Sequence, residues 1–147
     1  LLASPVQVAA MMNAIACGGV YRTPFFVEGT VDETQAAVSE AFSQPQGKRI
    51  LSEKTVDALR EMLEQVVAEG TAQDAAGLEE GAGGKTGTAQ TGQFRDGEEL
   101  KNHWFAGFYP AEKPRWTIVV MQDAQTEPEV SSAAVFARLC TALRLLG

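Results

Sequence analysis

Two runs of strand-forming residues near the C-terminal end of the chain constrain the fold most strongly. Residues 103–109 are rich in aromatic side chains, and residues 116–122 are mostly β-branched or apolar. Both compositions are typical of β-strands. The turn between them is short and bounded by two prolines, and antiparallel neighbours are the strands that so short a connection joins. The sequence therefore predicts an antiparallel meander in this region. We expect Trp104 and Phe105 to lie in its core.

Three amphipathic segments are predicted to be helices around this meander. They span residues 4–17, residues 52–69 and a last stretch that begins at Ser131 or Ser132, so each starts with a serine suited to the N-cap position. Their apolar residues recur at helical spacing. The predicted buried stripes are Val8, Met11, Met12 and Ile15; Val56, Leu59, Leu63, Val66 and Val67; and Val135, Phe136, Leu139, Leu143 and Leu146. The opposite face of the second helix, which carries Arg60, is predicted to be solvated.

The remaining segments are short or polar. Residues 25–27, 36–38 and 49–51 are candidate strands, and residues 71–77 are expected to form one more helical turn. Residues 91–102 are polar and contain glycine, a composition typical of loops. We therefore expect a loop between the strands that flank this stretch.

Composition and charge exclude several classes of function. The 147 residues carry a formal net charge of −7 without any cluster of Lys or Arg, which argues against nucleic acid or an anionic membrane surface as a partner. His103 is the single histidine, so a His/Cys zinc site is not expected, and no other metal or cofactor is predicted. Cys17 and Cys140 are interpreted as small hydrophobic residues, with a disulfide between them left open.

The stretch from Gly83 to Gln90 combines a lysine, hydroxyl groups and glycines within eight residues. Gly-Lys-Thr invites comparison with a phosphate-binding P-loop. That motif requires a glycine five positions before its second one. Glu79, a carboxylate, occupies this position, and the following residues are a poor start for a helix. The sequence therefore does not favour nucleotide binding.

An extended strand is the better interpretation of this stretch. Successive side chains of a strand point to opposite faces, so Thr86 and Thr88 share one face and Lys85 begins on the other. Gly87 leaves room for a substrate backbone. A lysine with two hydroxyls suits a carboxylate, and exposed backbone N–H groups on such a strand can stabilise an oxyanion. An ordinary glycine-rich edge strand remains the alternative.

Four ordered blocks of the sequence resemble the C-terminal half of the transpeptidase domain of penicillin-binding proteins. They are residues 4–20 with Pro24, residues 50–52 with 62–72, residues 84–90, and residues 104–110. The continuation at residues 88–90 is similar to the monofunctional, class B branch of that family. This resemblance covers essentially the whole chain.

The resemblance implies a β-lactamase/transpeptidase-like fold, an α/β arrangement of the α+β type. Residues 1–147 would form a partial domain with three antiparallel strands near residues 82–90, 103–109 and 115–122, flanked by helices. The last helix would pack on one face of this sheet. The helices at residues 4–17 and 52–69 would belong to the part of the domain beyond the other face.

The resemblance also implies serine acyl transfer. In the family a serine attacks the D-Ala-D-Ala amide of a peptidoglycan stem peptide, and β-lactams acylate the same serine. Carried onto this chain, Lys85 and Thr88 would be catalytic. Thr86, Gly87 and Thr88 would bind the substrate, with the Thr88 backbone N–H in the oxyanion hole.

The nucleophile of the family is not in this sequence. The chain contains neither Ser-x-x-Lys nor Ser-x-Asn, because no serine stands two positions before Asn13 or Asn102. We expect a fragment of a protein on the outer face of the bacterial cytoplasmic membrane, partnered by the missing N-terminal half or by a second copy. A β-lactam sensor, a serine β-lactamase and a non-catalytic assembly module are the alternatives.

Overall fold

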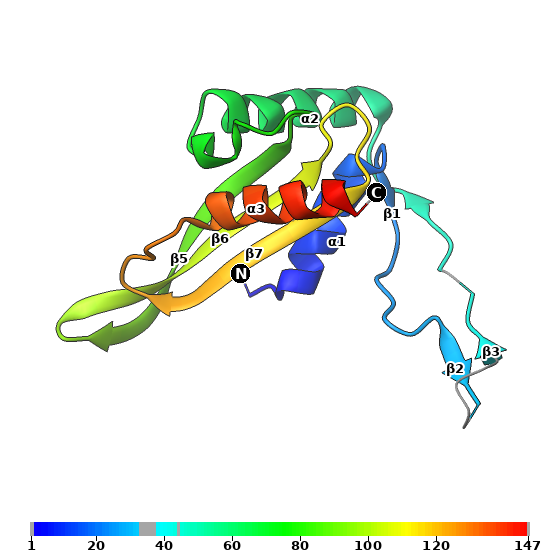
Figure 1. Cartoon of the computed structure of the whole chain (residues 1–147), viewed down its shortest axis with the longest axis horizontal. Helices are drawn as coiled ribbons and strands as arrows, with labels where there is room; N and C mark the ends of the chain where they lie inside the picture. Colours follow the sequence, from blue (N-terminus) through cyan, green and yellow to red (C-terminus); the bar gives the residue numbers. More distant parts are fainter. Residues whose placement is uncertain (1, 33–37, 44, 147) are drawn as a thin grey trace.

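The structure is a computed structural model that describes residues 2–32, 38–43 and 45–146. A central antiparallel sheet runs in the order β5 (Gly83–Arg95), β6 (Glu98–Tyr109) and β7 (Trp116–Gln125) (Figure 1). Among the described residues, β5 lies at one edge of this sheet. The mixed helical and antiparallel architecture expected from the sequence is therefore confirmed. Each helix within the described residues is too short or too polar to span a bilayer.

One face of the sheet is covered by α3 (Ser132–Leu145), whose cap Ser131 accepts a hydrogen bond from the Ala134 N–H. Phe136 reaches the strands and packs on Phe105 with ring centroids 4.6 Å apart, and both side chains are fully buried. The expected core position of Phe105 is confirmed. Leu139 and Leu146 were predicted to face inward but are exposed. Phe136 and Cys140 take the core-facing positions of α3 instead of Leu139, and Leu146 is the C-cap residue, past the end of the helix.

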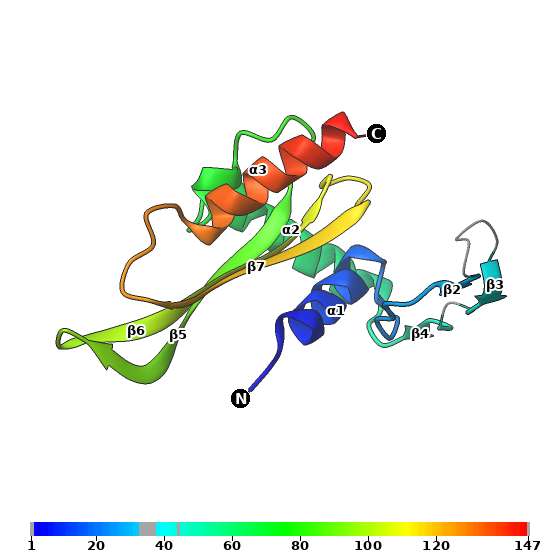
Figure 2. The ribbon, with the colours of Figure 1, turned by 60° about the horizontal axis from the view of Figure 1, so that its bottom comes forward.

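The opposite face is covered by α1 (Pro5–Ala16), as Figure 2 shows. Ser4 and Gln7 form the predicted capping box. Met12 is buried against Ala106 and Phe108 of β6. Met11 was predicted to be buried but is 56% exposed, because adjacent helical positions point about 100° apart and Met12 occupies the sheet-facing one.

The helix α2 (Glu53–Ala68) packs along β5 and buries Val56 and Val67. The solvated role predicted for Arg60 is wrong. Its guanidinium donates to the carbonyl oxygens of Ala111 and Glu112 in the turn after β6, and it lies 5.7 Å from the centroid of the Phe108 ring. The long apolar stem of arginine lets a surface position of the helix reach that turn.

Two small antiparallel ribbons precede α2. In one, β1 (Val20–Tyr21) pairs with β4 (Lys48–Arg49), and in the other β2 (Gly29–Val31) pairs with β3 (Val38–Ala41). The strand predicted at residues 25–27 is wrong, since these residues lie between β1 and β2 and belong to neither strand. Ala36 and Ala37 of the second candidate strand lie outside the described residues, and the third candidate pairs only at Arg49.

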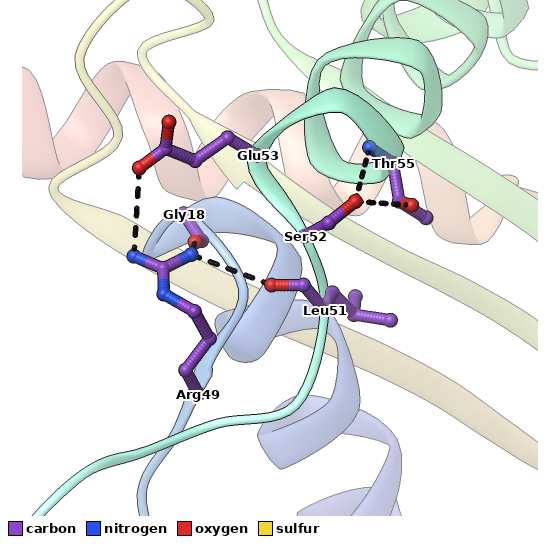
Figure 3. Close-up of polar contacts among 6 residues, drawn as sticks. All are labelled: Gly18, Arg49, Leu51, Ser52, Glu53 and Thr55. Carbon is purple, nitrogen blue, oxygen red and sulfur yellow. Dashed lines mark hydrogen bonds and ion pairs between the residues drawn. The ribbon is translucent and has the colours of Figure 1, made fainter.

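Arg49 joins the end of α1 to the start of α2 (Figure 3). Its guanidinium donates to the carbonyl oxygens of Gly18 at 2.8 Å and Leu51 at 3.3 Å, and it lies 3.9 Å from the Glu53 carboxylate. Ser52 then caps α2 by accepting from the Thr55 N–H at 3.2 Å. The predicted start of α2 at Ser52 is thus confirmed, and Arg49 links this start to the end of α1.

The loop predicted for residues 91–102 is wrong. β5 and β6 continue outward as a hairpin that extends past the helices (Figures 1 and 2). Asp96 and Gly97 form its turn with φ angles of 53° and 87°. Two successive left-handed residues are the geometry of the tightest hairpin turns, and Asp-Gly is a strong sequence signal for it.

Candidate functional site

Two buried glycines fix the start of β5 against its neighbour. A Cβ on Gly84 would lie 2.4 Å from Cζ of Phe105 and 2.8 Å from the carbonyl oxygen of Ala106, and one on Gly83 would meet the Phe108 ring at 2.2 Å. No side chain fits at either position. Glycine at both positions therefore lets β5 pack directly against the aromatic rings of β6. The residues that follow, from Lys85 onward, are placed by this contact.

The register of β5 places the predicted site residues as the sequence indicated. Thr86 pairs with Phe105 and Thr88 with His103, so both threonines lie on the face that α3 covers. Lys85 begins on the other face. Its ammonium nevertheless donates to the Thr86 carbonyl oxygen at 3.0 Å and to the Thr86 hydroxyl at 3.2 Å. Lys85 and Thr86 are therefore brought together at the exposed edge of the sheet.

Thr71 is a site residue that sequence reasoning missed. It follows α2, and its hydroxyl oxygen lies 2.8 Å from that of Thr86. One indication of Thr71 was present in the sequence. It directly follows Gly70, which ends the predicted helix, and it lies in one of the blocks that resemble the family. That signal places Thr71 in a turn, but it does not reveal which strand the turn touches.

A cavity of about 150 Å³ adjoins these hydroxyl groups. At about 30 Å³ for each water molecule in the liquid, it has room for a small polar group such as a carboxylate. Its lining residues come from the turn after α2, from β5 and β6, and from the loop and first turn of α3: Thr71, Thr86, Gly87, Thr88, His103, Trp104, Pro128, Ser131, Ser132 and Ala133.

His103 and Trp104 form part of the wall of this cavity. Trp104 was expected in the core, but it is only partly buried and lines the cavity beside Gly87. The backbone carbonyl of His103 accepts from the Ser132 hydroxyl at 2.9 Å. Its buried Nε2 has no hydrogen-bond partner in the described part of the chain. The cavity therefore combines the threonine hydroxyl groups with the His103 position of β6, whereas the Trp104 side chain starts on the other face of the sheet.

Polar side-chain contacts also fix the turn before β5 and the start of α3. Arg144 of α3 forms an ion pair with Glu79, and the Tyr109 hydroxyl donates to the Glu80 carboxylate at 3.0 Å, so both acids fix the turn before β5. Burial, together with this carboxylate, raises the pKa of Tyr109 above its ordinary value. Ser131 donates to Asp74, in the 3₁₀-helix η1 (Gln73–Ala75) that confirms the predicted helical turn.

The cysteines are separate from this site and from each other. Cys140 is fully buried in the core beneath α3, and this burial raises its thiol pKa to about 12. Cys17 is exposed at the end of α1. Both are free thiols, so the disulfide left open by the sequence does not form in this structure.

The chain matches known proteins over nearly its whole length. Residues 1–141 match the family described as the penicillin binding protein transpeptidase domain. Stage V sporulation protein D of Bacillus subtilis is 36% identical over 123 residues, which cover 82% of this chain and 19% of that protein. Penicillin-binding protein PbpB of Mycolicibacterium smegmatis is 33% identical over 137 residues, covering 81% of this chain and 20% of that protein.

The fold also matches a solved structure of this kind. The D,D-transpeptidase domain of a peptidoglycan glycosyltransferase from Eggerthella lenta superposes with a TM-score of 0.76 and 31% sequence identity. The match covers 99% of this chain and 33% of that one. The chain thus spans about a third of the solved structure and about a fifth of the two curated relatives. Family model, relatives and fold agree, and the chain belongs to the penicillin-binding protein transpeptidase domain family.

Proposed function

We propose that this chain is part of a serine-type peptidoglycan D,D-transpeptidase and supplies its substrate-binding strand. The longer polypeptide to which we assign it is called the parent protein below. The observation that carries the proposal is the bonded group of Lys85, Thr86 and Thr71 at the edge of β5, beside a cavity sized for a carboxylate. We propose the monofunctional class for the parent protein, with the sequence at residues 88–90 as support.

The substrate in this proposal is a stem peptide that ends in D-Ala-D-Ala. The hydroxyls of Thr86 and Thr88 hold its terminal carboxylate, and a β-lactam presents its own carboxylate to the same groups. Lys85 contributes positive charge where the anion lies. Hydrogen bonds to an ionised partner are about twice as strong as those between neutral groups, which favours binding at this edge.

The reaction transfers the penultimate D-alanyl group. A serine oxygen attacks its carbonyl carbon, the C–N bond to the last D-alanine breaks, and D-alanine leaves with a proton on its amine. An amine of a neighbouring stem peptide then attacks the acyl-enzyme, forms the cross-link and releases the serine. The Thr88 backbone N–H is assigned to the oxyanion hole, and Gly87 leaves room for the substrate backbone.

The nucleophile belongs to the remainder of the parent protein, on the outer face of the cytoplasmic membrane. That remainder, or a second copy of this chain, would cover apolar groups that are exposed here. Phe26 is 80% and Val27 is 55% exposed, and a second cavity of about 420 Å³ lies between α1 and residues 22–26. Exposed apolar patches of this kind mark contact surfaces.

The proposal is tested by giving the parent protein a stem peptide that ends in D-Ala-D-Ala, with and without an acceptor amine. We expect D-alanine release and a cross-linked product that requires the acceptor. A stable penicilloyl adduct without turnover of the stem peptide would indicate a β-lactam sensor. Rapid hydrolysis of penicillin would indicate a β-lactamase. Absence of all three activities would indicate a non-catalytic module and overturn the proposal.

A further inference from the structure

We propose that Thr71 is a positioning residue for the site, which directs the Thr86 hydroxyl toward the carboxylate of the ligand. This inference rests on the proposed function. Thr71 does not itself need to touch the ligand, because its hydroxyl oxygen lies 2.8 Å from that of Thr86. It therefore acts on the site through Thr86.

The backbone around Thr71 is held in one place by its two neighbours. The N–H groups of Gly70 and Ala72 donate to the same carbonyl oxygen, that of Val66, at 3.1 and 3.2 Å. Ala72 is fully buried, and a Cβ on Gly70 would lie 2.8 Å from this oxygen. The hydroxyl of Thr71 is thus presented to β5 by the end of a packed helix.

The direction of the hydrogen bonds follows from the chemistry of the groups. A hydroxyl has one hydrogen to donate and two lone pairs that accept, whereas an ammonium group only donates. Lys85 therefore donates to the Thr86 oxygen, at 3.2 Å. If Thr71 also donates to it, both lone pairs of Thr86 are used and its single hydrogen is left for the ligand.

Binding of a carboxylate selects this arrangement. A carboxylate only accepts, so Thr86 must donate to it, and the hydrogen bond from Thr71 must then run toward Thr86. Two donors on one hydroxyl also polarise it and strengthen the bond that it makes. Thr71 thus prepares Thr86 for an anion before the ligand arrives, which saves reorganisation on binding.

The test measures acylation of the full-length parent protein by benzylpenicillin as a function of drug concentration. Thr71→Val removes the hydroxyl but keeps the shape of the side chain. We expect the dissociation constant of the complex that forms before acylation to rise about five- to tenfold, which corresponds to the loss of one hydrogen bond. The limiting acylation rate should change less than twofold. Thr71→Ser, which keeps the hydroxyl, should restore the constant.

A matched control and a double variant make the test specific. Thr141→Val removes another exposed hydroxyl, which bonds within α3, and should leave both constants unchanged. If Thr71 acts through Thr86, then adding Thr71→Val to Thr86→Val should weaken binding no further. Circular dichroism of each variant checks that it is folded.

Three results would overturn the inference while leaving the proposed function intact. They are wild-type constants for Thr71→Val, additive losses in the double variant, and no recovery with Thr71→Ser. If Thr71→Val does not fold, the Thr71→Ser variant decides. It keeps the positioning hydroxyl and should bind benzylpenicillin as tightly as wild type, so weaker binding would overturn the inference. A wild-type parent protein that benzylpenicillin fails to acylate would overturn both the proposed function and this inference.

Discussion

Replacing Lys85 with alanine is expected to slow acylation of the parent protein by benzylpenicillin about 10²–10³-fold, the usual loss when one group that stabilises a developing charge is removed. The ammonium donates to the backbone and side chain of Thr86 at the edge of β5, so its removal takes away both charge and local order. Stopped-flow or quenched-flow measurement of penicilloyl-enzyme formation gives the rate directly.

Lys113 provides the control for this experiment. It is an exposed lysine in the turn between β6 and β7, and Lys113→Ala removes the same charge from the protein. We expect its acylation rate to stay within twofold of wild type. Equal effects of the two variants, or a Lys85→Ala rate within a few-fold of wild type, would contradict the role assigned to Lys85.

Replacing Gly84 with alanine is expected to destabilise the fold by about 1–3 kcal/mol, the usual cost of overfilling a packed core. The added methyl group would lie 2.4 Å from the buried Phe105 ring and 2.8 Å from a backbone oxygen that cannot move independently. Urea unfolding of the chain, followed by tryptophan fluorescence, measures the change in the free energy of unfolding.

Gly87 is the matched position on the same strand. A Cβ there would meet only Cβ of Trp104, at an ordinary 3.6 Å, so Gly87→Ala should change stability by less than about 1 kcal/mol. In the parent protein it should nevertheless slow acylation about 10²-fold, because a misplaced ligand reacts poorly. Similar stability losses in the two variants, or unimpaired acylation of Gly87→Ala, would count against this division of roles.

The elements that the sequence predicted well are those fixed by local chemistry. Ser4 and Ser52 cap their helices because a serine side chain satisfies free N–H groups wherever the helix goes. The polar hairpin at residues 91–102 was missed because its residues are mostly polar and neither strand shows apolar alternation, even though Leu100 is buried. Asp96-Gly97 was the signal that could have identified it.

The site was predictable along β5 but not across the fold. Strand alternation correctly placed Thr86 and Thr88 on one face. The contact from Thr71 to Thr86 depends on how α2 packs against the sheet, and no periodicity encodes that distance. The contact of Arg60 with the turn after β6 escaped prediction for the same reason, since an exposed helical position gives no sign of a distant partner.

We propose that this chain forms the substrate-binding wall of an acyl-transfer site whose nucleophile lies elsewhere in the parent protein. Labelling with fluorescent penicillin, followed by mass spectrometry of the modified peptide, tests it most directly. We expect the parent protein to be labelled on a serine outside residues 1–147, and the isolated chain to remain unlabelled. A penicilloyl adduct within residues 1–147 would show that the nucleophile lies in this chain and would overturn the proposal.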